Sequence, residues 1–198
     1  EARESLAVHG ISVKDVSVDI PVMLNRKNEI VKQLTGGITQ LFKANGVSHI
    51  KGAGTLLAQK NISVIDESGV ETVYSADNIV LATGSSPIDI PIAKQDGEYI
   101  VDSTGALEFS SVPKRLGIIG AGVIGLELGS VWKRLGSEVV LLEAMDAFLP
   151  AMDQFIAKET KKTLGRQGLD IRLGCRVLSA EIKNTQVDEY PALVDPKF

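Results

Sequence analysis

The sequence contains very little of several residue types, and each shortage excludes a class of protein. Cys175 is the one cysteine in 198 residues, so this chain by itself forms no disulfide framework, thiolate zinc site or dithiol redox pair. The 21 Lys and Arg residues are outnumbered by 25 Asp and Glu, which disfavours a nucleic-acid-binding surface. No apolar run approaches the roughly 18 residues needed to span a bilayer. Residues 1–4 do not resemble a signal or transit peptide.

Glycine, by contrast, is abundant and unevenly distributed. Six of the 19 glycines lie between Gly117 and Gly136. Hydrophobic residues at 44% and charged residues at 23% are typical of a soluble globular chain, and the length allows one domain or two small ones. We place a domain boundary near Pro113, after an irregular segment that begins at about Pro87.

The part before Pro113 begins with a predicted helix. Asp19 is a suitable N-cap, and Gly46 is a suitable C-terminal stop. The apolar residues that recur between them at helical spacing are Ile30, Leu34, Ile38, Leu41 and Phe42. Gly36 and Gly37 lie inside this helix, and we interpret them as sites of close packing against a neighbouring element.

The pattern changes to β-strands over residues 47–80. Residues 61–65 and 70–74 alternate between apolar and polar side chains around a turn at 66–69, as in a hairpin. We expect this hairpin to belong to a three-stranded β-meander. The continuous apolar run at 78–84 is typical of a buried parallel strand that ends in small residues.

Strands and helices alternate after Pro113. The predicted elements are strands at 115–119, 138–143 and 169–173, and helices at 123–135 and from Asp153 to about Gly168. This βαβαβ order is half of a doubly wound fold, so we predict an α/β protein with partial Rossmann-like nucleotide-binding domains and a parallel sheet. Residues 184–198 show no clear period and are predicted to form an irregular tail.

A glycine-rich turn connects the first of these strands to the first of these helices. Gly120 permits a tight turn, Gly122 lets the backbone approach a pyrophosphate, and Gly125 lets helix and strand pack closely. The N-terminus of the following helix presents free N–H groups and a positive dipole end to phosphate. The candidate pyrophosphate site comprises Gly120, Ala121, Gly122, Val123, Ile124 and Gly125.

Glu143 stands at the end of the second strand, 18 residues after Gly125. A carboxylate at this place accepts hydrogen bonds from the ribose hydroxyls of adenosine. It would repel the 2′-phosphate of NADP(H), and residues 144–147 contain no arginine, so NAD(H) is the favoured cofactor. The alternative, a structural turn beside a surface glutamate, does not account for the full order of strand, turn, helix, strand and acid. From spacing alone, Glu127 is interpreted as a complement to the helix dipole.

Four segments carry a resemblance to a known family. They are residues 79–85 (IVLATGS), 101–109 (VDSTGALEF), 120–129 (GAGVIGLELG) and 138–150 (EVVLLEAMDAFLP). Together they resemble the dihydrolipoyl dehydrogenases, a branch of the pyridine nucleotide–disulfide oxidoreductase family, more closely than its glutathione or mercuric reductases. The resemblance extends over about residues 1–183.

The resemblance implies a domain organisation and further cofactor contacts. Residues 1–112 would be part of an FAD-binding domain, and residues 113–183 would be the first half of an NAD-binding domain. The residues implied to contact FAD are Gly54, Ala82, Thr83 and Gly84. The residues implied to contact NAD, besides the turn and Glu143, are Glu127 near the nicotinamide and Val177 at the adenine end.

The activity implied by the resemblance is re-oxidation of protein-bound dihydrolipoamide. Electrons would pass from a dithiol through an enzyme disulfide and FAD to NAD+. The implied partner is a lipoyl-bearing protein of a 2-oxo acid dehydrogenase complex or of the glycine cleavage system, with no nucleic acid and no membrane. The enzyme is expected to be a homodimer, in the cytoplasm of bacteria or in the mitochondrial matrix of eukaryotes.

Several functional groups of the family have no counterpart in these 198 residues. The redox cysteine pair and the His–Glu base are missing, and Cys175, His9 and His49 do not match them. We therefore expect no catalytic residue and no metal ligand. We interpret the chain as an internal fragment that binds NAD(H) but is inactive alone. Two alternatives stay open: a non-catalytic nucleotide-binding or interaction module, and another flavoprotein NADH oxidoreductase.

Overall fold

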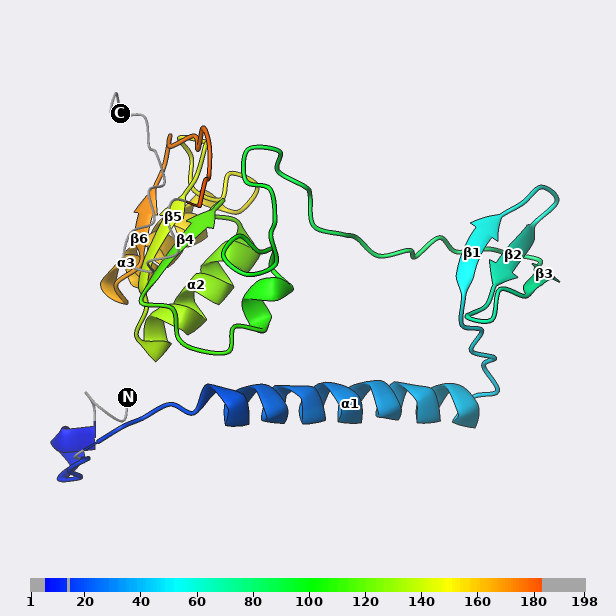
Figure 1. Ribbon diagram of the computed structural model, residues 1–198, viewed down its shortest axis with the longest axis horizontal. Coiled ribbons are helices and arrows are strands. Elements are labelled where there is room, and N and C mark those ends of the chain that lie inside the picture. The colour runs from blue at the N-terminus through cyan, green and yellow to red at the C-terminus, as the bar shows by residue number, and fades with distance from the viewer. Residues whose placement is uncertain (1–5, 14, 183–198) are drawn as a thin grey trace. The chain divides into compact units, whose positions relative to one another are not determined.

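A computed structural model describes residues 6–13 and 15–182, and the chain divides into two compact units. The first unit comprises Glu1–Leu24 and Pro87–Phe198, and the second comprises Asn25–Ser86. Helix α1 (Ile20–Ala44) begins in the first unit and continues into the second (Figure 1). No helix within the described residues has both the length and the apolar character needed to cross a membrane. The tail predicted at 184–198 lies outside the described residues.

The structure confirms the N-cap and the C-terminal stop that the sequence predicted for α1. Asp19 Oδ1 accepts the N–H of Val22 at 3.0 Å, as an N-cap does. At the other end, the N–H of Val47 donates to the carbonyl of Phe42 at 2.9 Å. Gly46 adopts a φ of +64°, so α1 ends in the left-handed glycine geometry that is common at helix C-termini.

The interpretation of Gly36 and Gly37 as packing sites is wrong for the described chain. A Cβ added at either position would meet nothing within 4 Å. The apolar stripe of α1 is also exposed, from 37% at Phe42 to 64% at Leu34. From this helix, Ile20, which is 4% exposed, is buried in the hydrophobic cluster of the first unit, and Met23 and Leu24 pack against that cluster.

The second unit contains the predicted antiparallel meander. Its strands are β1 (Ala53–Leu56), β2 (Asn61–Ile65) and β3 (Glu71–Ser75), paired in the order β1-β2-β3. In the turn between β2 and β3, Asp66 Oδ1 accepts the N–H groups of Ser68 and Val70 at 2.8 and 3.0 Å. The hydrogen bond from the Ser68 hydroxyl, followed by the bond from the Val70 N–H, lowers the pKa of Asp66.

The parallel strand predicted at 78–84 does not form. These residues are described throughout and belong to no strand, and Val80 and Leu81 are 86% and 70% exposed. A buried parallel strand needs neighbours that share its backbone hydrogen bonds. The strands of this unit pair only with one another, so the apolar run has no strand beside it within the described residues.

The first unit contains the predicted βαβαβ arrangement (Figure 1). Its elements are the 3-10 helices η1 (Leu6–His9) and η2 (Gly105–Leu107), then β4 (Arg115–Ile119), α2 (Val123–Leu135), β5 (Glu138–Leu142), α3 (Gln154–Arg166) and β6 (Asp170–Arg172). The strands form one parallel sheet in the order β4-β5-β6. Near their carboxyl ends, Ile119, Leu142 and Arg172 lie in one row across the sheet.

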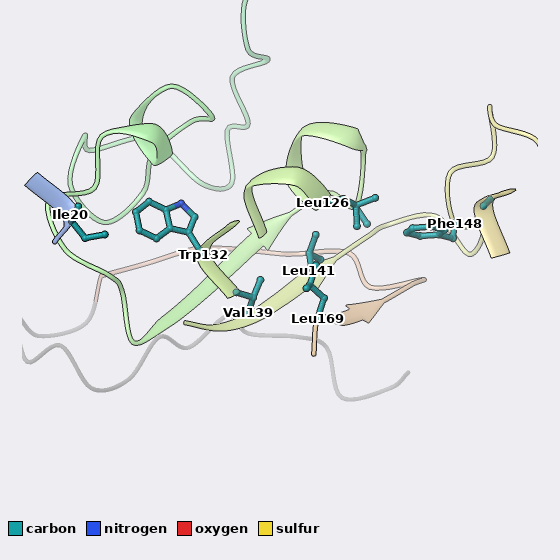
Figure 2. Packing of buried hydrophobic residues seen from close by; sticks show 9 residues of the cluster. Ile20, Leu126, Trp132, Val139, Leu141, Phe148 and Leu169 are labelled. Atoms are coloured by element: carbon teal, nitrogen blue, oxygen red, sulfur yellow. The ribbon is translucent and has the colours of Figure 1, made fainter. Parts of the chain in front are cut away.

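The core of the first unit lies between α2 and the sheet. Leu141 and Val139 of β5 are 0% and 1% exposed, and they belong to one buried cluster with Leu126, Trp132 and Leu169 (Figure 2). Trp132 of α2 is 2% exposed and donates its Nε1–H to the carbonyl of Ala106 in η2 at 3.1 Å. These contacts fix α2, and therefore its N-terminus, against the strands.

Two glycines shape the connection between β4 and α2. Gly120 has a φ of +97°, a conformation that favours glycine. A Cβ added at Gly125 would lie 2.5 Å from the carbonyl oxygen of Gly120 and 3.2 Å from Ile118 Cγ2. The structural roles predicted for these two glycines, a tight turn and close packing, are confirmed.

Replacement of Leu141 by alanine is expected to lower the free energy of unfolding by about 2–5 kcal/mol, because it leaves a cavity in the core. Urea unfolding followed by the fluorescence of Trp132, the single tryptophan, measures this loss. The control Val131→Ala, at a 45% exposed position on α2, should change stability by less than about 0.5 kcal/mol. Equal losses of unfolding free energy in the two variants would contradict the assignment of Leu141 to the core.

Gly125→Ala is expected to destabilise the first unit by about 1–3 kcal/mol, because the new Cβ overlaps the Gly120 carbonyl oxygen. Gly165→Ala is the matched control, since a Cβ at this position of α3 meets nothing within 4 Å. There the same change should stabilise the helix by up to about 1 kcal/mol. Urea unfolding of both variants measures whether the two changes in the free energy of unfolding have opposite signs. Equal stability of Gly125→Ala and the parent chain would refute the steric argument.

Candidate functional site

The chain segments that follow β4, β5 and β6 are joined by main-chain hydrogen bonds at the carboxyl edge of the sheet. The N–H of Gly120 donates to the carbonyl of Leu142 at 2.8 Å. The N–H of Glu143 donates to the carbonyl of Arg172 at 2.9 Å, and the carbonyl of Glu143 accepts the N–H of Cys175 at 2.8 Å. The glycine turn and Glu143 therefore lie next to each other, at the edge where open α/β sheets bind ligands.

The carboxylate of Glu143 connects two segments of the main chain. Its Oε2 accepts the N–H of Ala121 in the glycine turn at 3.0 Å, and its Oε1 accepts the N–H of Met145 at 2.9 Å. Ala121 is 2% exposed, whereas Glu143 is partly exposed. Each carboxylate oxygen offers two lone pairs, so these two bonds leave acceptor capacity for the hydroxyl groups of a ribose.

The turn is open on the side of Gly122. This residue is the N-cap of α2 with an extended backbone, and a Cβ added to it would meet nothing within 4 Å. The next two side chains, Val123 and Ile124, are 55% and 61% exposed. The first N–H groups of an α-helix lack partners within the helix and lie at the positive end of its dipole. The geometry can therefore accommodate an anion such as a pyrophosphate.

Two further residues that the resemblance assigned to NAD belong to the same unit. Glu127 is exposed on α2, four residues after Val123. Val177 follows β6 and is 7% exposed. Their contacts with the nicotinamide and with the adenine end stay predictions.

The residues that the resemblance assigned to FAD belong to the second unit. Gly54 is an exposed residue of β1 and pairs with Val64 of β2. Residues 82–84 are exposed and lie outside any strand, with a φ of +74° at Gly84. The contacts of Gly54, Ala82, Thr83 and Gly84 with FAD stay predictions.

The sequence analysis missed two features of the site. The first is the N–H of Met145, the second donor to Glu143. The sequence could have indicated this contact, because Met145 lies two residues after an acidic side chain, a spacing at which side chain–backbone hydrogen bonds form. Arg172 adjoins Glu143 through the backbone, but its Nε and Nη2 donate to Asp170 Oδ2 at 2.9 and 2.7 Å. The hydrogen bond from Arg172 to Asp170, and then the charge of Asp170, raises the pKa of Arg172.

Within the part of the chain that the structure describes, metal-binding clusters are absent and the one cysteine lies at this edge. Across residues 6–13 and 15–182, no group of three or more His, Cys, Asp or Glu residues could hold a metal ion. Cys175 is a free, partly buried thiol, and its Sγ lies 3.5 Å from the carbonyl oxygen of Leu173.

Comparisons with known proteins identify the family and the relatives of this chain. Residues 2–194 match the family model described as pyridine nucleotide-disulphide oxidoreductase. The chain is 49% identical over 176 residues to a dihydrolipoyl dehydrogenase of Cupriavidus necator, covering 88% of this chain and 37% of that protein. It is 45% identical over 181 residues to the mitochondrial dihydrolipoyl dehydrogenase 1 of Arabidopsis thaliana, covering 91% of this chain and 36% of that protein.

A solved structure shows the same fold. The crystal structure of LpdA from Mycobacterium tuberculosis matches with a TM-score of 0.79 and 24% identity, over 92% of this chain and 41% of that one.

The chain spans little more than a third of the length of the two dihydrolipoyl dehydrogenases, at 37% and 36%. With nearly all of its length matched by the family model, the chain belongs to the pyridine nucleotide–disulfide oxidoreductase family, and within that family it is similar to the dihydrolipoyl dehydrogenases.

Proposed function

We propose that the chain binds NAD(H) at its glycine turn and serves as a nucleotide-binding part of an enzyme of the dihydrolipoyl dehydrogenase type. The observation that carries this proposal is the 3.0 Å hydrogen bond from the Ala121 N–H to the Glu143 carboxylate. This bond holds the Glu143 carboxylate next to the N-terminus of α2, where it would accept ribose hydroxyls while the helix N-terminus would bind the pyrophosphate. The turn residues Gly120 to Gly125 would hold the pyrophosphate, and Glu127 and Val177 would lie towards the two ends of the nucleotide.

Charge favours NAD(H) over NADP(H) at this site. A 2′-phosphate on the adenosine ribose would face the carboxylate of Glu143, and like charges repel. Residues 144–147 contain no arginine. Arg172 is already bonded to Asp170 at 2.7 Å, so its use for a phosphate would compete with that ion pair.

For the complete enzyme, the relatives support the re-oxidation of protein-bound dihydrolipoamide with FAD and NAD+. The flavin and the nicotinamide supply the electron-transfer chemistry when they are bound, while the protein binds and orients them. Residues 1–112 would contribute to FAD binding, with Gly54, Ala82, Thr83 and Gly84 as contacts, and residues 113–183 would contribute to NAD binding. The partner would be a lipoyl-bearing protein, and the enzyme would be a homodimer.

A non-catalytic nucleotide-binding module is the second candidate. Its support is the single cysteine of this sequence, which leaves the nucleotide site without the dithiol that the family's chemistry requires. Both candidates include NAD(H) binding, and they differ in whether this chain works within a larger redox enzyme.

Titration calorimetry of the chain with NADH is expected to show saturable binding that Gly122→Val weakens at least tenfold. The branched side chain would occupy the open space at Gly122 that the pyrophosphate requires. A tenfold loss corresponds to about 1.4 kcal/mol of binding free energy.

Two controls accompany this titration. Gly165→Ala on α3 should bind NADH as the parent chain does, and NADPH should bind the parent chain more weakly than NADH. Absence of any saturation by millimolar NADH would refute the proposed binding.

Lipoamide-dependent oxidation of NADH by the isolated 198-residue chain is expected to be undetectable, because Cys175 has no second cysteine in this sequence with which to form a redox disulfide. The loss of NADH absorbance measures the rate, with a complete dihydrolipoyl dehydrogenase assayed in parallel. Turnover by the isolated chain would contradict its assignment as a binding part and would also exclude the non-catalytic module.

A further inference from the structure

We propose that Glu143 is a positioning residue that holds the glycine turn in its nucleotide-binding shape before any nucleotide binds. This inference rests on the proposed function, because that function makes the turn the pyrophosphate site. It adds a role in the ligand-free chain, separate from the acceptance of ribose hydroxyls.

The glycine turn needs support from outside itself. Gly120 adopts a φ of +97°, and glycine loses more conformational freedom on ordering than any other residue. The next residue, Ala121, is 2% exposed, so its N–H is a buried donor that would be costly to leave without an acceptor. Glu143 Oε2 supplies that acceptor at 3.0 Å and thereby orients the peptide group between Gly120 and Ala121.

Glu143 is itself anchored on both sides. Its N–H and carbonyl bond to Arg172 and Cys175 at 2.9 and 2.8 Å. Its second carboxylate oxygen, Oε1, accepts the N–H of Met145 at 2.9 Å. Oε1 therefore holds the side chain against the segment that follows β5. Oε2 then fixes the glycine turn relative to that segment.

In this geometry the two main-chain N–H donors bond to different oxygens of Glu143, Oε2 for Ala121 and Oε1 for Met145, and this arrangement separates the positioning role from ribose binding. Glutamine has one acceptor oxygen, and its NH2 group would face one of the two N–H donors. Glutamine can still accept a hydrogen bond from a ribose hydroxyl. Glu143→Gln should therefore disturb the ligand-free turn even where it preserves a ribose contact.

Amide hydrogen exchange in the ligand-free 198-residue chain, followed by NMR, tests the inference. In Glu143→Ala, the N–H groups of Ala121 and Met145 are both expected to exchange about tenfold faster than in the parent chain. In Glu143→Gln, one of the two should do so. The N–H of Leu141 in β5 is the internal reference and should keep its exchange rate, which a general loss of stability would change.

Glu138→Gln is the matched control at the other end of β5. The Glu138 side chain is 71% exposed, and its Oε2 lies 3.9 Å from Arg115 Nε, so the exchange of Ala121 and Met145 should not change. Exchange rates in Glu143→Ala within twofold of the parent would overturn the inference. Equal acceleration at Ala121, Met145 and Leu141 would also overturn it, because the residue would then be merely structural.

NADH titration of the same samples separates this inference from the proposed function. Faster exchange in the Glu143 variants would support the positioning role even if the parent chain bound no NADH. The lack of NADH binding would then refute the proposed function alone. NADH binding by the parent, with unchanged exchange in Glu143→Ala, would refute the positioning role alone.

Discussion

The pairing of β5 with both β4 and β6 is the interaction on which the candidate site depends. β5 runs parallel to each neighbour, and its Val139 and Leu141 are buried in the core with α2 at 1% and 0% exposure. Parallel strands held in this way end at the same edge of the sheet. The glycine turn after β4 and Glu143 after β5 are therefore brought together by the same packing that stabilises the first unit.

The chemistry at this edge follows from the groups that the strands deliver there. Within the described residues, these groups are main-chain N–H donors, the Glu143 carboxylate and an Arg172 side chain that is paired with Asp170. Such groups recognise phosphate and hydroxyl groups well. The chemistry of the family also requires a pair of thiols, whereas this sequence contains one cysteine. The role proposed for this edge, to bind and orient a nucleotide, rests on these donors and on this carboxylate.

Local sequence signals predicted most of the first unit correctly. Asp153 caps α3 by accepting the N–H groups of Phe155 and Ile156, and Gly136 ends α2 with a φ of +120°. Caps of this kind depend on residues within one turn, so they can be recognised from sequence. The same reasoning failed for the run at 78–84 and for Gly36, because strand formation and close packing depend on partners from elsewhere in the fold.

Three features could be read from local sequence patterns: the βαβαβ order, the glycine turn that begins at Gly120, and the acid at the end of the second strand. Which atoms bond to one another depends on the folded chain: Glu143 accepts the N–H groups of Ala121 and Met145 at 3.0 and 2.9 Å, and Arg172 forms an ion pair with Asp170. The bond between Ala121 and Glu143 joins segments that are distant in the chain. Their approach depends on the register of β4 and β5, which is set by pairing and burial across the sheet and not by any local pattern.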